Sequence, residues 1–190
     1  YNPEFIAQGS IVDDLRHADM VLLGGEGQHS GALEMIYYQI QNGFKVANVH
    51  TMSTRAAELT KIAVNCYLTT KITYANQVGQ VMIRDGMEDE VKTVLKAIGG
   101  DSRIGTKYLN YGFGFGGPCF PRDNRAFAAY ASKAGVETPL GATTDKFNDE
   151  HTEFLKEYFI NKNKDNRAYV FHYLTYKDGV DILTESRPYD

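Results

Sequence analysis

Cysteine is scarce in this sequence, because the 190 residues include only Cys66 and Cys119, far apart in the chain. Two isolated cysteines do not form the dense disulfide framework of small secreted domains. Long apolar runs are also missing, since none approaches the ~18 consecutive apolar residues that a membrane-spanning helix needs. The polar stretch YNPEFIAQGS (1–10) lacks the apolar segment of a signal peptide. We therefore expect a cytoplasmic protein with reduced thiols and no membrane partner.

Basic charge is not in excess either. Twenty Lys and Arg residues stand against 24 Asp and Glu residues, which gives a net charge of −4. Domains that bind nucleic acid carry a basic face, so we expect no nucleic-acid partner. We also assign no metal ligands. The remaining composition, 43% hydrophobic and 23% charged, is that of an ordinary soluble globular protein.

Hydrophobic periodicity predicts a mainly α-helical fold. The longest pattern extends from Ser53 to Arg84 without a proline, with apolar residues three and four positions apart. At ~1.5 Å per residue such a helix is longer than one small domain can cover, so we expect much of it to pack on a second copy. On its pattern alone it equally suits a plain core helix. Further helices are expected at 30–42, 88–98, 122–134 and 141–161, and strands at 20–25, 44–50 and 168–177.

One stretch, GFGFGGPCFPRD (112–123), combines a glycine-rich loop with a cysteine. Gly112, Gly114 and Gly117 fit the G-x-G-x-x-G pattern of dinucleotide-binding loops, which works only between an incoming strand and an outgoing helix. We expect neither, because the preceding residues show no strand pattern and the two prolines would prevent a helix from continuing out of the loop. We interpret the loop as one whose backbone approaches a ligand closely because glycine has no Cβ.

Cys119, at the end of this loop, is the candidate nucleophile. A cysteine needs a nearby base or positive charge to become a thiolate. Arg122 and Asp123 follow in what reads as the first turn of a helix, which would bring Asp123 back near Cys119. The alternative is a buried structural cysteine in a tight turn. Cys66 lies at core spacing inside the long helical pattern, and we predict a small buried apolar residue there.

Five segments, in order along the chain, resemble the UDP-glucose dehydrogenase family. The stretch 112–123 is similar to the family signature G-x-G-F-G-G-x-C-F-P-K-D, and DSRIG (101–105) matches the segment before it. NPEF (2–5) resembles the family's N-P-E-F-L-x-E-G, and 56–78 resembles its long central helix. LTYKDGVDILTES (174–186) resembles T-Y-K-x-x-x-D-x-x-R-E-S.

The resemblance implies three domains, of which this chain covers parts. Residues 1–50 would be the C-terminal end of a Rossmann domain that binds NAD. Residues 51–161 would be a central helical domain that forms a homodimer and carries the catalytic residues, and 162–190 the start of a C-terminal α/β domain. The NAD site would lie mostly outside this chain, which we therefore expect to be inactive alone.

The resemblance also implies a reaction, the two-step oxidation of UDP-glucose to UDP-glucuronate by NAD. Cys119 would add to the aldehyde intermediate as a thiohemiacetal, which becomes a thioester and is released by water. Lys61 would stabilise oxyanion character, Asn65 would bind the sugar and a water, and Asp123 would take part in proton transfer. Glu4 would help water attack the thioester. Substrate-binding roles are implied for Phe5, Ile6, Arg103, Tyr108, Asn110, Gly112, Phe115, Gly116 and Lys177, with Arg103 reaching across the dimer interface.

The sequence departs from the family pattern where Arg122 replaces a lysine, Gln8 a glutamate and Thr184 an arginine expected to help bind the cofactor. Bulky residues also precede T-Y-K, where family members usually have a glycine. GDP-mannose or a UDP-N-acetylhexosamine stays open as the substrate, although Phe113 and Phe115 favour UDP-glucose. A catalytically vestigial dimerisation module is a second alternative. A cysteine-based transferase or hydrolase without NAD is a third, but none of the five histidines is near Cys119 in sequence.

Overall fold

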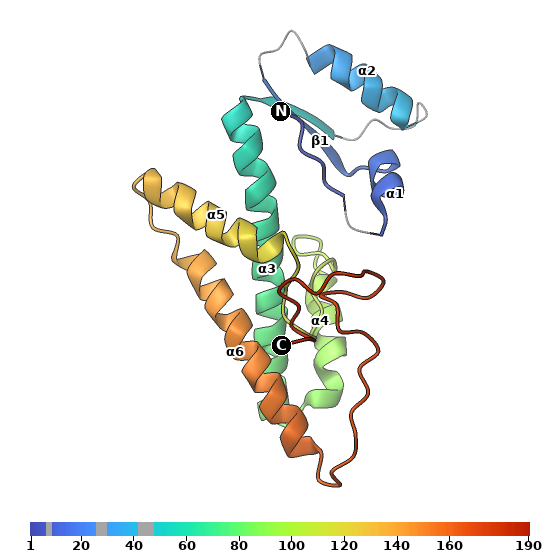
Figure 1. Ribbon diagram of the computed structural model, residues 1–190, viewed down its shortest axis with the longest axis vertical. Helices are drawn as coiled ribbons and strands as arrows, with labels where there is room; N and C mark the ends of the chain where they lie inside the picture. Colours follow the sequence, from blue (N-terminus) through green and yellow to red (C-terminus); the bar gives the residue numbers. More distant parts are fainter. Residues whose placement is uncertain (7–8, 26–29, 42–47) are drawn as a thin grey trace. The chain divides into compact units, whose positions relative to one another are not determined.

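The computed structural model describes residues 1–6, 9–25, 30–41 and 48–190. Gln8, one of the departures from the family pattern, lies outside the described residues, as does much of the strand expected at 44–50. The chain divides into two compact units, Tyr1–Val64 and Asn65–Asp190. The boundary falls inside the continuous helix α3 (Thr54–Arg84), so each unit contains part of it (Figure 1).

The first unit contains a pair of parallel strands, β1 (Met20–Gly24) and β2 (Asn48–Met52), with Met20 opposite Asn48. Parallel neighbours need a crossover connection, and helix α2 (Ser30–Ile40) lies in the segment between them. The short helix α1 (Ile11–Arg16) precedes β1. Val21 and Leu23 form a small core with the side chains of Ala18, Leu33, Tyr37 and Val49.

The second unit is helical. After α3 come a single 3₁₀ turn η1 (Glu88–Glu90), α4 (Val91–Gly99), α5 (Phe120–Lys133) and α6 (Pro139–Lys162). Helix α6 runs beside the second half of α3 (Figure 1), where Gln80 hydrogen-bonds His151 and Arg84 pairs with Glu157. The apolar core of this unit contains Ala75, Met82, Val91, Leu95 and Leu109.

The prediction of a mainly helical fold with one long helix is confirmed, and α3 begins one residue after the expected start. The strand expected at 168–177 is wrong, because these residues are irregular. An alternating pattern describes the two faces of a strand but does not provide a neighbour, and a strand without a hydrogen-bonded partner is not stable. None of the described helices combines the length and the apolar character needed to cross a membrane.

Candidate active site

Cys119 is exposed and occupies the N-cap position of α5. The first hydrogen bond of the helix runs from the Asp123 amide to the Cys119 carbonyl at 2.8 Å, which sets Asp123 one turn after Cys119. Pro121 fits in this first turn, where a backbone N–H has no helical partner to lose. Our expectation that the prolines would keep a helix from continuing out of the loop is therefore wrong. Because Cys119 is exposed, the alternative of a buried structural cysteine is wrong.

Asp123 is 3% exposed, and both of its carboxylate oxygens are engaged. Oδ2 accepts a hydrogen bond from Nδ2 of Asn65 on α3 at 2.6 Å, and Oδ1 accepts from Nε of Arg122 at 2.9 Å. The carboxylate raises the pKa of the Arg122 guanidinium, so a permanent positive charge lies beside it. The structure thus joins two of the predicted catalytic residues, Asn65 and Asp123, in one buried pair.

Cys66 differs from the prediction of a buried apolar residue. It is half-buried, and its Sγ lies 3.6 Å from the carbonyl oxygen of Asp123. Burial raises the pKa of the Cys66 thiol to about 11, with further contributions from the negative charges of Asp123 and Asp145. This thiol is therefore protonated at neutral pH.

The glycines of the loop make room mainly for the chain's own atoms. A Cβ on Gly114 would lie 2.1 Å from Oδ1 of Asn148, and one on Gly116 would lie 2.0 Å from the carbonyl oxygen of Glu185. Gly117 has φ of +79° and faces the ring of Tyr176. Gly112 differs, because a Cβ there would meet no described atom within 4 Å. We expected a ligand to lie close to these glycines, but atoms of the protein itself occupy that space at Gly114, Gly116 and Gly117.

This arrangement does not fit a dinucleotide. Residues 107–111 are irregular, so no strand leads into the loop. The amide of Gly117 is already bonded to the carbonyl of Thr184 at 3.0 Å, and the space beside Gly116 and Gly117 is filled from the C-terminal segment. We derive no step through NAD from the described residues.

The first unit carries the other predicted catalytic residues. Nζ of Lys61 donates a hydrogen bond to the backbone carbonyl of Glu4 at 2.7 Å and lies 4.5 Å from the centre of the Phe5 ring. The Glu4 side chain itself is exposed, and Ile6 is half-buried. Asn2 fixes this segment to β1 through a 2.8 Å hydrogen bond to the carbonyl of Leu22. Lys61 therefore meets the main chain of the predicted segment, not its carboxylate.

The remaining predicted substrate contacts lie in the second unit. Arg103 is exposed and forks onto Asp101, with Nε–Oδ1 and Nη2–Oδ2 distances of 2.9 and 2.6 Å. Tyr108 has a φ of +62°, a strained value for a tyrosine, and its ring meets Phe120 edge-on. Asn110 is exposed, whereas Lys177 is half-buried in the irregular C-terminal segment.

Three polar residues that the sequence did not single out contact the same loop. Asn148 bonds both backbone groups of Phe115, while Asn76 and His151 bond those of Gly112. Burial lowers the pKa of His151. Asn76 lies within 56–78, the stretch that resembles the family's central helix, whereas the sequence marks Asn148 and His151 only as polar residues at core spacing in a helix.

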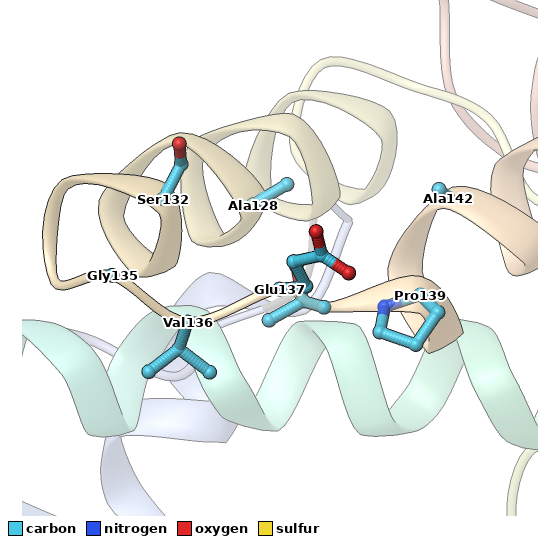
Figure 2. A pocket seen from close by; sticks show the side chains of 8 residues that line it. Ala128, Ser132, Gly135, Val136, Glu137, Pro139 and Ala142 are labelled. Atoms are coloured by element: carbon cyan, nitrogen blue, oxygen red, sulfur yellow. The ribbon is translucent and has the colours of Figure 1, made fainter.

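A surface pocket of about 510 Å³ lies away from these residues, at the turn between α5 and α6 (Figure 2). Ala128, Val136, Pro139 and Ala142 give it mainly apolar walls, and Glu137 projects beside them. None of the predicted site residues lines it.

Comparison with known proteins identifies the chain. A model of the central domain of the UDP-glucose/GDP-mannose dehydrogenase family matches residues 55–150, which include all but the first residue of α3, the glycine loop and Cys119. The chain belongs to this family. The family resemblance predicted from the five segments is therefore confirmed, and the stretch that matches the family's central domain contains Cys119.

Relatives of this chain extend the match beyond the central domain. It is 32% identical to the UDP-glucose 6-dehydrogenase of Pseudomonas aeruginosa, over 97% of this chain and 41% of that protein. It is 40% identical to the UDP-glucose 6-dehydrogenase of Drosophila melanogaster, over 64% of this chain and 26% of the relative. A solved UDP-glucose dehydrogenase from Pyrobaculum islandicum superimposes with a TM-score of 0.79 at 30% identity, covering 98% of this chain and 42% of that one. The chain thus spans less than half the length of these relatives.

Proposed function

We propose that the whole protein oxidises the primary alcohol of UDP-glucose through an aldehyde to the carboxylate of UDP-glucuronate, in the cytoplasm and with NAD as the oxidant. The observation that carries this proposal is the exposed thiol of Cys119 at the head of α5, one turn before the buried Asp123–Asn65 pair. The UDP-glucose 6-dehydrogenases among its relatives support the choice of sugar.

Cys119 makes the second oxidation possible, because an aldehyde carries no further hydride that it can lose until a nucleophile has added. The sulfur bonds to the aldehyde carbon, the thiol proton leaves, and the carbonyl oxygen takes up negative charge and then a proton. Loss of the hydrogen on that carbon as hydride, with the proton leaving the oxygen, restores the C=O bond as a thioester. Water then attacks, the C–S bond breaks and the carboxylate and the thiol are released.

Asp123 is proposed to take part in proton transfer, and Asn65 to bind the sugar and a water near the thiol. The pairing supports this role, because an anion held on both oxygens by Arg122 and Asn65 has little rotational freedom. Lys61 is proposed to stabilise the oxyanion and Glu4 to help the water attack the thioester. The grip of Lys61 on the Glu4 backbone supports a link between these two groups.

The nucleotide sugar is proposed to bind along the segments that contain Arg103, Tyr108 and Asn110, with Phe5, Ile6 and Lys177 as further contacts. The planar fork of Arg103, which grips a carboxylate bidentately here, has the geometry that also suits a phosphate. Phe115 and Gly116 are buried, so we propose that they shape the loop while Gly112 offers the open approach.

A homodimer through α3 is proposed for the whole protein. Tyr67, Tyr74 and Val81 are spaced seven residues apart and are 64%, 52% and 67% exposed, so they form one apolar stripe. A seven-residue spacing is typical of helices that pack against each other. Light scattering on the whole protein with Tyr74→Glu should then give the monomer mass, while Glu58→Gln, an exposed substitution on the same helix, keeps the dimer mass.

The reaction is tested by incubating the whole enzyme with NAD and UDP-glucose, GDP-mannose or a UDP-N-acetylhexosamine in turn. We expect two molecules of NADH to form per molecule of UDP-glucose consumed. With each of the other sugars, NADH should form at less than about one-tenth of the rate seen with UDP-glucose. Faster oxidation of another sugar would move the proposal to that substrate. No NADH from any of them, together with a dimer, would favour a vestigial dimerisation module.

A further inference from the structure

Three buried side chains hold the backbone of the glycine loop, and none of them has a chemical role in the proposed reaction. They are Asn76 on α3 and Asn148 and His151 on α6, and each is at most 2% exposed. Buried amide and imidazole groups are costly unless they are hydrogen-bonded. Here their hydrogen bonds go to the backbone of the loop.

Asn148 pairs with Phe115 in the way one strand residue pairs with another. Its Oδ1 accepts the Phe115 N–H at 2.9 Å, and its Nδ2 donates to the Phe115 carbonyl at 2.8 Å. The amide also occupies the space in which a side chain at position 114 would begin. One side chain on α6 therefore satisfies both polar groups of a buried residue that belongs to no regular element.

His151 does the same for Gly112 together with Asn76. Nε2 of the imidazole lies 2.7 Å from the Gly112 carbonyl, and Oδ1 of Asn76 accepts the Gly112 N–H at 3.1 Å. Because a carbonyl can only accept, Nε2 carries the hydrogen, and Nδ1 then accepts from the Gln80 amide at 2.7 Å. Both ring nitrogens are engaged, so His151 is not available as a base for a cysteine nucleophile.

The two clamped residues, Gly112 and Phe115, bracket the loop just before Cys119. Both polar groups of each are bonded to α3 or α6, so the path of 112–115 is tied to the helices and does not depend on a ligand. The α5 N-cap follows four residues after Phe115. We infer that Asn148 and His151 are positioning residues, which fix the loop and thereby the place where Cys119 meets the substrate.

The test uses the whole protein with His151→Phe, which keeps a stacked ring between Phe147 and Phe154 but removes both hydrogen bonds. His151→Gln is the conservative variant, because its amide can still donate to the Gly112 carbonyl. Thr152→Val is the matched control, since Thr152 is also buried on α6 but its hydroxyl bonds the backbone carbonyl of Asn148 in its own helix. Asn148→Asp keeps the shape of the amide and loses the donor to Phe115.

Three readouts are compared: amide hydrogen exchange of 108–118, the rate of Cys119 alkylation with and without UDP-glucose, and KM against kcat. We expect His151→Phe and Asn148→Asp to speed loop exchange and to weaken protection of Cys119 by UDP-glucose by at least about tenfold, with His151→Gln within a few-fold of the wild type. KM for UDP-glucose should rise more than kcat falls. If both variants lower the melting temperature but match Thr152→Val in exchange and alkylation, the inference is overturned.

The effects on KM and on the protection of Cys119 by UDP-glucose rest on the proposed function, whereas loop exchange and the alkylation rate without the sugar do not. A wild-type enzyme that makes no NADH from UDP-glucose would refute the proposed function. Faster loop exchange and a changed Cys119 alkylation rate in His151→Phe would still support the positioning role in that case.

Discussion

The two cysteines share a neighbour and differ in almost everything else. Cys66 lies half-buried in the middle of α3 and points its sulfur at the backbone of Asp123, and burial raises its pKa to about 11. Cys119 lies exposed at the N-cap of α5, one turn before the same aspartate. Burial and the nearby carboxylates disfavour a thiolate at Cys66, whereas the exposed sulfur of Cys119 is open to a reagent or a substrate. Burial and neighbouring negative charge therefore separate two thiols that lie next to the same aspartate.

The largest expected effect separates the two cysteines in catalysis. In the whole enzyme, Cys119→Ser should lower the rate of UDP-glucuronate formation by at least about 1,000-fold, because a hydroxyl is far less nucleophilic than a thiol. Cys66→Ser should change it by less than about threefold, because the proposed reaction does not use that sulfur. NADH formation and product analysis measure both, and a Cys66→Ser enzyme as inactive as Cys119→Ser would contradict the comparison.

Alkylation tests the same contrast without turnover. With a pKa of about 11, roughly one Cys66 in a thousand is a thiolate at pH 8. We expect iodoacetamide to modify Cys119 at least about 100-fold faster than Cys66 and UDP-glucose to slow only the Cys119 reaction. Peptide mass spectrometry of the folded protein measures the two rates. Equal rates would show that the exposed position gives Cys119 no advantage.

Asp123→Asn should alter the surroundings of both cysteines through their shared neighbour. Asn65 and Arg122 would lose the anion between them, and we expect a loss of about 2 kcal/mol in the free energy of unfolding. Because the Asp123 charge helps to raise the pKa of Cys66, that thiol should react a few-fold faster in the variant. Denaturant unfolding and alkylation at pH 8 measure the two effects. Unchanged Cys66 reactivity would exclude the Asp123 charge as a cause and leave burial and Asp145.

The smallest expected effect is in the pH dependence of stability, to which His151 and Asp145 should contribute with opposite signs. Burial lowers the pKa of His151 below 6.5, so the unfolded chain binds more protons and stability falls as pH drops below ~6.5. Burial raises the pKa of Asp145, near Cys66, so its protonated form favours the folded state and stability falls as pH rises past ~4. The free energy of unfolding, measured between pH 4 and 7.5, should depend less on pH above pH 5 in His151→Gln and less on pH below pH 5 in Asp145→Asn. An unchanged pH dependence in either variant would contradict the role given to that residue.

Local patterns predicted the regular elements well, because apolar periodicity records which face of a helix is buried. The start of α5 was placed two residues late, since the prolines were taken as helix breakers although Pro121 lies where its missing N–H has no cost. The strand at 168–177 was wrong, because alternation does not reveal whether a neighbouring strand exists.

The site was predicted only as far as motifs reach. The motifs indicated Cys119, Asp123 and Asn65, and the structure brings the last two together. Asn148 and His151 were missed because their partners, Phe115 and Gly112, are 33 and 39 residues away in the chain. No spacing rule links a helical side chain to an irregular backbone at that distance.

Two hydrogen bonds made by side chains of α3 also fix the number of residues between them. Asn65 and Asn76 are eleven residues apart, about three helical turns, so both face the same side, one toward Asp123 and the other toward Gly112. Inserting or deleting one residue between them would turn Asn76 by about 100° relative to Asn65 and separate one of the two partners. Related sequences should therefore differ by substitutions in this stretch but not by gaps.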